Sequence, residues 1–286
     1  MDFTSPHSGS AVAALLPPSC QWRSAIPASD ALVQQVHDRG NAIYVLEQFL
    51  TPAECRAWIQ YGEEEKGFEE CAQEASRDYA FRKQARISFE STEVAQQIFD
   101  RISTRDDSIL PKSIDGLRAS GCSSNMRLYR YRVGDAFGRH IDESNEVTQD
   151  GVTHVSKFTA LVYLNGTAGT APAPPAVAAA ASAGGKDRAH EDELPHMQGG
   201  ETMFYRSHTA ARPVYSEAPK AGNLLLHRHG ARCLTHEAKA ATHGVKYVLR
   251  TDVLYSAQHA VDVSTQGQGA ASKHAKKMGQ KRGRGR

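Results

Sequence analysis

From Asn125 onwards, hydrophobic and polar residues alternate with a period of two, which is typical of β-strands that bury one face. In the first such stretch, Arg127, Tyr129 and Tyr131 share a face. Further strands are predicted over residues 158–165, 202–205, 223–227 and 246–255. Many short strands separated by turn residues predict an antiparallel sandwich or jelly roll.

The N-terminal half shows helical spacing instead. The stretch Thr51-Pro-Ala-Glu54 is typical of a helix start, with Thr51 as the N-cap, a proline in the first turn and Glu54 three residues past the cap. This helix is expected to bury Cys55, Trp58 and Ile59 and to end between residues 62 and 67. Ser91 predicts a second helix start, because apolar residues follow at 94, 98 and 102. We also predict a helix from about residue 30 (32, 33 and 36 on one side) and strands over 42–46 and 86–89.

These patterns predict an α+β fold with a jelly-roll core and N-terminal supporting helices, in one domain over residues 29–256. No catalytic residue is expected between 30 and 120. Residues 1–28 and 257–286 lack apolar periodicity and are predicted to be disordered. Residues 166–198 are rich in Ala, Pro and Gly and are interpreted as an unstructured surface insertion, with a lid over a site as the alternative.

Composition sets the class of protein. The hydrophobic fraction of 40% and the charged fraction of 23% are ordinary for a soluble globular chain. Five scattered cysteines without a CxxC spacing argue against a disulfide framework and favour a reducing compartment, the cytoplasm or the nucleus. We expect neither a signal peptide nor a membrane span, since no apolar stretch is long enough.

The charge of the chain is uneven. Its net charge is +2, yet residues 273–286 hold seven basic side chains and no acidic one. The rest of the chain is therefore mildly acidic. The basic tail is a candidate contact for nucleic acid, a phosphorylated partner or an acidic surface, or a localisation signal. A solvated end without a specific partner explains the pattern equally well.

The first candidate for chemistry is His140-Ile-Asp142, which follows a predicted strand and a turn after Gly134. On an extended backbone, residues i and i+2 point to the same side, so His140 and Asp142 aim a nitrogen and an oxygen at one point. They supply two members of a 2-His-1-carboxylate set, which suits ferrous iron with open positions. Alone the motif is weak, because two solvated polar residues after a turn have the same pattern.

A third ligand is sought in the second half of the chain, which contains His227, His229, His236 and His243. His236 lies just after an apolar strand and a glycine-containing turn, ten residues before Lys246. The competing register is His243 with an anion pocket at Arg250. It is disfavoured because it leaves little chain for the turn into the strand that begins at Lys246.

The strand that starts at Lys246 carries charge on one face, because Lys246, Val248, Arg250 and Asp252 alternate. A charged side chain inside a barrel is costly unless a partner neutralises it. Lys246 is thus a candidate for binding the carboxylate of a small molecule. The alternative is that Lys246 reaches solvent at the strand end and that Arg250 pairs with an acidic residue.

Residues 125–255, with the insertion set aside, resemble the Fe(II)- and 2-oxoglutarate-dependent dioxygenases, specifically the prolyl 4-hydroxylase alpha-subunit-like catalytic domains. Five matches occur in order. They are Tyr131 nine residues before His140 with a glycine between them, the strand 159–165, the run Gly199-Gly-Glu-Thr-Met-Phe204, the run 219–226, and His236 followed by Lys246. The helix start at 50–55 also resembles the support helix of that family.

The resemblance implies a double-stranded β-helix and a set of roles. His140, Asp142 and His236 would hold Fe(II). Lys246 would bind the far carboxylate of 2-oxoglutarate, with a hydrogen bond from Tyr131 or Tyr163. Arg250 would either reinforce this anion pocket or face the substrate. O₂ is the implied second co-substrate, and ascorbate is a candidate reductant.

Peptidyl-proline hydroxylation of a protein or peptide substrate, with succinate and CO₂ as co-products, is the activity that the resemblance favours. The alternatives are an oxygenase of the same chemistry that acts on nucleic acid or on a small molecule, and a jelly-roll binding module without turnover. No cluster of stacking aromatic residues supports the nucleic-acid alternative.

Overall fold

The computed structural model describes residues 33–37, 42–105, 110–167 and 194–257. The first part contains two helices and seven strands: β1 (Val33–His37), β2 (Ile43–Leu46), α1 (Pro52–Gln60), β3 (Glu69–Gln73), β4 (Arg82–Glu90), α2 (Thr92–Arg105), β5 (Ser113–Ile114), β6 (Leu117–Cys122) and β7 (Asn125–Tyr131). A π-helical turn, Tyr61–Lys66, extends α1.

The second part consists of strands and one 3₁₀ turn, Gly230–Arg232. Its strands are β8 (Phe137–His140), β9 (Glu146–Gln149), β10 (Val152–Tyr163), β11 (Met197–Gly199), β12 (Thr202–Tyr205), β13 (Tyr215–Glu217), β14 (Leu224–Arg228), β15 (Thr235–Ala238), β16 (Ala241–Gly244) and β17 (Lys246–Ser256).

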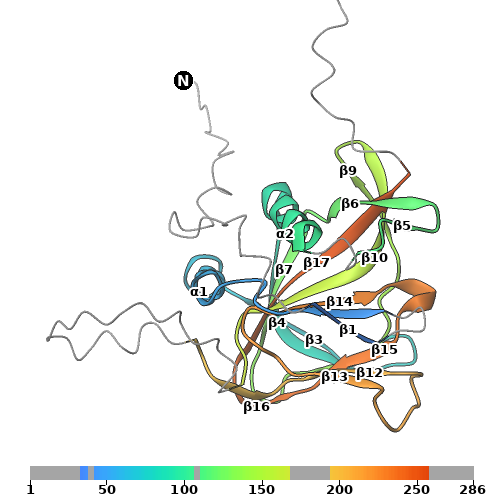
Figure 1. Cartoon of the computed structure of the whole chain (residues 1–286). Coiled ribbons are helices and arrows are strands. Elements are labelled where there is room, and N and C mark those ends of the chain that lie inside the picture. The colour runs from blue at the N-terminus through green and yellow to red at the C-terminus, as the bar shows by residue number, and fades with distance from the viewer. Residues whose placement is uncertain (1–32, 38–41, 106–109, 168–193, 258–286) are drawn as a thin grey trace, which may run out of the picture.

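One antiparallel sheet folds over on itself. Its strands run in the order β1-β2-β14-β10-β17-β7-β4-β8-β15-β12-β13 (Figure 1). The first strands through β4 form the larger layer, and β8, β15, β12 and β13 form a smaller layer. The two layers enclose one cavity, which is lined by residues of β7, β10 and β17 on one side and of β8, β12 and β15 on the other. This is the jelly-roll core expected from the sequence.

The larger layer is buried on both faces, because alternate residues enter two different cores. Leu128, Val162 and Leu249 pack with residues of α1 and α2 in the outer core. Their neighbours Tyr129 and Tyr163 enter the inner core between the layers. A strand covered on both faces can be apolar throughout, and the polar side chains of its inner face are therefore buried between the two layers.

The helix starts follow the capping rules. The Thr51 hydroxyl accepts from the backbone N–H of Glu54, and the Glu54 carboxylate accepts from the N–H of Thr51. The Ser91 hydroxyl likewise accepts from the N–H of Val94. Both predicted helices are confirmed, and the π-helical turn that extends α1 ends at Lys66, within the predicted limits.

Glu54 also anchors α1 to α2 through a buried ion pair. Its two carboxylate oxygens contact the Arg101 guanidinium at 2.6 and 3.1 Å, and both side chains are less than 10% exposed. Removing one partner leaves an uncompensated buried charge. We expect Glu54→Ala to lower the free energy of unfolding, measured by urea denaturation, by about 3–5 kcal/mol. The exposed Glu64 provides the control substitution Glu64→Ala, and equal effects of the two would contradict a stabilising role of the pair.

The prediction of a helix from about residue 30 is wrong where the structure tests it. Residues 33–37 form β1, which pairs antiparallel with β2, with Val33 opposite Leu46 and Gln35 opposite Tyr44. Hydrogen bonding to a neighbouring strand overrides weak helical spacing in so short a segment. The other part of that prediction, residues 30–32, lies outside the described residues.

The predicted insertion, 166–198, is too long at its C-terminal end. Met197 is fully buried, and β11 pairs with β16, because backbone pairing orders a segment that has no apolar period of its own. Residues 168–193 lie outside the described residues. So do the predicted disordered N-terminus, 1–28, and all but the first residue of the predicted disordered tail, 257–286. Among the described helices, none has the length and apolar character needed to cross a bilayer.

Candidate functional site

Three polar side chains meet where β8 and β15 pair. The register sets His236 directly opposite His140, and their ring centroids lie 4.2 Å apart. Asp142 follows two residues after His140. The Nε2 atoms of His140 and His236 lie 3.7 and 3.8 Å from the Asp142 carboxylate. One potential ligand atom from each residue lies within 4.8 Å of the other two.

Separations of this size place a common centre about 2–3 Å from each donor, close to a metal–ligand bond length. Each histidine is also fixed in the ring form that a metal needs. Nδ1 of His140 lies 2.8 Å from the Gly138 carbonyl, and Nδ1 of His236 lies 3.0 Å from the Leu234 carbonyl. A carbonyl can only accept, so Nδ1 carries the proton and Nε2 presents its lone pair.

The ionisation states match this arrangement. Burial and the neighbouring His236 lower the pKa of His140 to about 3, and burial lowers the pKa of His236, so both rings are neutral at pH 7. For Asp142, burial alone would raise the pKa, but Arg250 and the histidines hold it well below its usual value. Two neutral imidazoles and one carboxylate are a donor set for a divalent transition metal.

Asp142 has two further partners. The Thr159 hydroxyl donates to its Oδ2 at 2.5 Å, and Nη2 of Arg250 donates to the same oxygen at 3.1 Å. Arg250 also lies 3.4 Å from Asp252, so it pairs with acidic residues, as the alternative interpretation expected. His140 is held from its other side by Phe137, whose ring stacks on it at a centroid distance of 3.7 Å.

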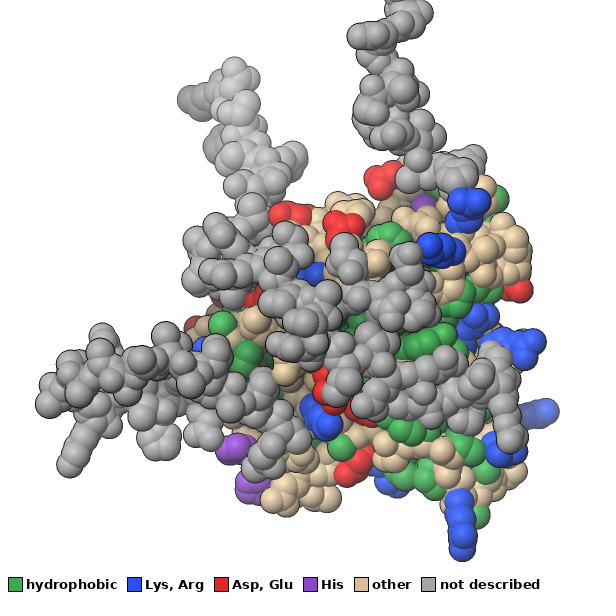
Figure 2. Space-filling model, in the orientation of Figure 1, with side chains coloured by type: hydrophobic (Ala, Val, Ile, Leu, Met, Phe, Trp, Pro, Cys, Tyr) green, Lys and Arg blue, Asp and Glu red, His purple; other side chains and the backbone are tan. Residues whose placement is uncertain are grey.

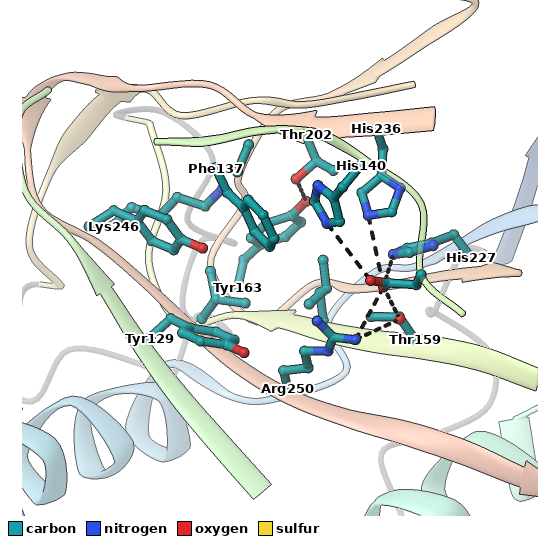
Figure 3. A pocket seen from close by; sticks show the side chains of 15 residues that line it. Tyr129, Phe137, His140, Thr159, Tyr163, Thr202, His227, His236, Lys246 and Arg250 are labelled. Atoms are coloured by element: carbon teal, nitrogen blue, oxygen red, sulfur yellow. Dashed lines mark hydrogen bonds and ion pairs between the residues drawn. The ribbon is translucent and has the colours of Figure 1, made fainter. Parts of the chain in front are cut away.

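Lys246 lies in the same cavity, away from these ligands. Figure 3 shows it on one side and His140, His227 and His236 on the other. The side chain is buried (2% exposed) and does not reach solvent. Its Nζ lies 5.6 and 5.3 Å from the ring centroids of Tyr131 and Tyr163.

No acidic side chain forms an ion pair with Lys246 among the described residues. Its Nζ donates a hydrogen bond to the Gly200 carbonyl at 2.6 Å. Burial lowers the pKa of Lys246 to about 7, although Glu201 acts in the opposite direction. A buried amine without a counterion is costly, which makes this end of the cavity a candidate site for a carboxylate. The Tyr163 hydroxyl, hydrogen-bonded to Thr202 at 2.8 Å, borders the same space.

The structure adds one residue that motif reasoning passed over. His227, on β14, is 2% exposed and lies 3.8 Å from the Asp142 carboxylate. Neither of its ring nitrogens has a hydrogen-bond partner. The signal in the sequence was only its position at the end of an apolar strand. Its place beside Asp142 is set by the pairing of His227 with Thr159 across β10 and β14.

A second potential ligand group consists of His227, Cys233 and His236. It shares His236 with the first group, so the two groups compete for that ligand. A His₂Cys set is softer and favours copper or zinc, whereas two histidines and a carboxylate suit ferrous iron. The remaining histidines are placed elsewhere: His229 contacts the Thr159 hydroxyl at 2.7 Å, and His243 is exposed on β16.

No family model matches the chain, and no curated protein sequence matches it either. Solved structures of similar shape include a viral collagen prolyl hydroxylase from Paramecium bursaria Chlorella virus-1 in complex with 2-oxoglutarate (17% identity, TM-score 0.44, covering 74% of this chain and 95% of that one). A second is a prolyl hydroxylase from Trichoplax adhaerens in complex with a hypoxia-inducible factor peptide fragment (17% identity, TM-score 0.46, covering 74% of this chain and 83% of that one). A third is a Pseudomonas putida prolyl-4-hydroxylase (17% identity, TM-score 0.39, covering 74% of this chain and 92% of that one).

Proposed function

We propose that this chain is an Fe(II)- and 2-oxoglutarate-dependent dioxygenase that hydroxylates a C–H bond. One observation carries the proposal: a single buried cavity joins a 2-His-1-carboxylate cluster to a lysine that has no acidic partner in the described part of the chain. A binding module needs no such combination of metal donors and unpaired buried cation.

In this proposal, His140, Asp142 and His236 hold the iron, and Lys246 binds the far carboxylate of 2-oxoglutarate. The bound iron, with 2-oxoglutarate and O₂, supplies the oxidation, with succinate and CO₂ as co-products. The chain's own contribution is placement. The Gly138 and Leu234 carbonyls fix the two rings, and Thr159 and Arg250 orient the carboxylate of Asp142.

The roles of Tyr131 and Tyr163 follow from their positions beside Lys246. Burial raises the pKa of both phenols, so each is a neutral hydroxyl that can donate to a carboxylate. Tyr163 already shares a hydrogen bond with Thr202. We assign Tyr163 and Thr202 to the co-substrate carboxylate, and Tyr131 to the wall against which the lysine packs.

Peptidyl proline is the substrate that we propose, on the order and spacing of the five motifs between 125 and 255. The cytoplasm or nucleus is the proposed location, consistent with free thiols at all four described cysteines. Ascorbate enters only as a candidate reductant that keeps the iron ferrous.

The proposal is tested with the full chain under anaerobic conditions. Adding Fe(II) and 2-oxoglutarate is expected to produce the visible metal-to-ligand charge-transfer band of a chelated keto acid, and admitting O₂ is expected to produce succinate. Zn(II) in place of Fe(II) gives no such band and serves as the control. Absence of the band would remove the metal and co-substrate assignment. A band without succinate, even with proline peptides present, would favour the binding module.

A further inference from the structure

A groove of about 450 Å³ opens directly onto His140 and Asp142. Four arginines line it: Arg82, Arg86, Arg127 and Arg250. We call it the arginine groove. Any substrate that reaches the metal donors from this side passes these guanidinium groups, so their charge bears on what the site accepts.

Strand register gathers these arginines on one face. Across β4, β7 and β17, Arg86 lies opposite Tyr129, and Arg127 lies opposite Arg250. Paired residues of an antiparallel sheet point to the same side, and Arg82 joins them because it is four residues from Arg86 on the same strand. This face continues into the inner core beside the cavity.

Three of the four arginines lack a counterion. Arg250 pairs with Asp142 and Asp252, but no ion pair involves Arg82, Arg86 or Arg127 among the described residues. Each of the three is half-buried. The Arg82 guanidinium lies 5.3 Å from the Phe137 ring centroid, and its Nε is buried without a hydrogen-bond partner.

The opposite face of the same strands provides an internal comparison. There, Arg130 contacts Glu63 at 2.8 Å and Arg132 contacts Glu70 at 3.0 Å. These two arginines are therefore neutralised, whereas three of the four arginines in the groove form no ion pair among the described residues. Unpaired, half-buried guanidinium groups beside a reaction site are suited to bind carboxylates or phosphates of a ligand.

We propose that the substrate is an acidic polypeptide segment, in which carboxylate side chains flank the residue to be hydroxylated. The inference rests on the proposed function and narrows its substrate class. Arg82 and Arg86 are about 13 Å apart along β4, farther than one carboxylate or phosphate of a metabolite spans. Apolar side chains for peptide contact lie in the same groove, where Tyr79 is 65% and Ile141 47% exposed.

The surroundings of the groove favour a short acidic segment over a nucleic acid. On β3, Glu69 lies opposite Arg86 and is exposed. A long polyanion that extended past the groove would be repelled there. On the face drawn in Figure 2, the visible Lys and Arg side chains lie among apolar and uncharged ones.

The test measures binding by fluorescence anisotropy and so does not depend on turnover. Three labelled peptides of equal length share a central proline and differ only in their flanks: Asp/Glu, Asn/Gln or Lys. A single-stranded oligonucleotide is the fourth probe. We expect the acidic peptide to bind at least about tenfold more tightly than the neutral one, with the difference shrinking as salt is added. Equal affinities, or preference for the oligonucleotide, would overturn the proposal.

Substitutions of the groove arginines then test whether the acidic peptide binds in the arginine groove. Arg86→Gln combined with Arg127→Gln is expected to remove the preference for the acidic peptide. Arg86→Lys combined with Arg127→Lys is expected to keep most of this preference, because it keeps both charges. Arg118→Gln is the matched control, because Arg118 is exposed on β6 outside the groove. An equal loss in Arg118→Gln would contradict the groove as the binding site.

The dioxygenase assignment and the acidic-peptide proposal can be contradicted independently of each other. Fe(II) and 2-oxoglutarate titrations of the wild type, without peptide, test the proposed function alone. If the charge-transfer band is absent but the acidic peptide is still preferred, the dioxygenase assignment is wrong and the peptide site stands. If the band is normal but the acidic peptide is not preferred, the peptide site is wrong and the dioxygenase assignment stands.

Discussion

Replacing His236 by alanine is expected to abolish the anaerobic charge-transfer band and succinate formation. His236 supplies one of three donors, and loss of groups that only orient metal ligands already costs about 10–100-fold, so loss of a donor itself should exceed that. The same result is expected for His140→Ala and Asp142→Ala. The readout is the band in an Fe(II) titration at saturating 2-oxoglutarate, followed by succinate after O₂ is admitted.

The matched control is His243→Ala, the same change at an exposed histidine of β16 seven residues further on. This variant is expected to titrate like the wild type. Circular dichroism and the melting temperature of the metal-free protein separate loss of the donor from loss of the fold. A normal band in His236→Ala together with a lost band in His243→Ala would show that the competing register is correct.

Lys246→Met is expected to raise the 2-oxoglutarate concentration needed for half-saturation by about 10–100-fold, the usual value of a hydrogen bond to a charged group. Methionine keeps the length and apolar stem of lysine and removes its charge. Because the change acts on co-substrate binding, succinate formation at saturating 2-oxoglutarate should be affected much less. The measurement is a 2-oxoglutarate titration of the band at fixed Fe(II).

The same lysine gives the co-substrate a pH dependence. With its pKa lowered to about 7 by burial, Lys246 is mostly charged at pH 6 and mostly neutral at pH 8, and only the charged form attracts a carboxylate. The half-saturating 2-oxoglutarate concentration of the wild type should therefore rise about tenfold between pH 6 and pH 8. Lys246→Met should lack this rise, and an equal rise in the variant would place the titrating group elsewhere.

Local sequence accounted for much of the fold, because the relevant interactions connect neighbours in the chain. The reciprocal bonds of Thr51 and Glu54 and the cap at Ser91 span three residues each. The alternation of side chains along a strand likewise does not depend on which strand it pairs with, so Tyr129 and Tyr131 could be placed on one face. The strand over residues 33–37 could not be predicted in this way, because it forms through its pairing with β2.

In the candidate site, too, local sequence indicated some residues and not others. His140 and Asp142 share a side because they are two residues apart, and Lys246 opens a strand that is visible in the alternation. The sequence pattern predicts no catalytic residue between positions 30 and 120. Arg82 and Arg86 nevertheless line the groove, a role that no local pattern on β4 indicated.

The sequence by itself determined the helix caps, the jelly-roll class and the spacing of the motif residues, since each depends on backbone geometry over a few positions. Tertiary structure alone decided that His227 reaches Asp142, that Lys246 is enclosed without a counterion, and that three arginines remain unpaired beside the cavity. Which side chains neutralise one another depends on strands that are distant in sequence, and their register is fixed only when the sheet closes.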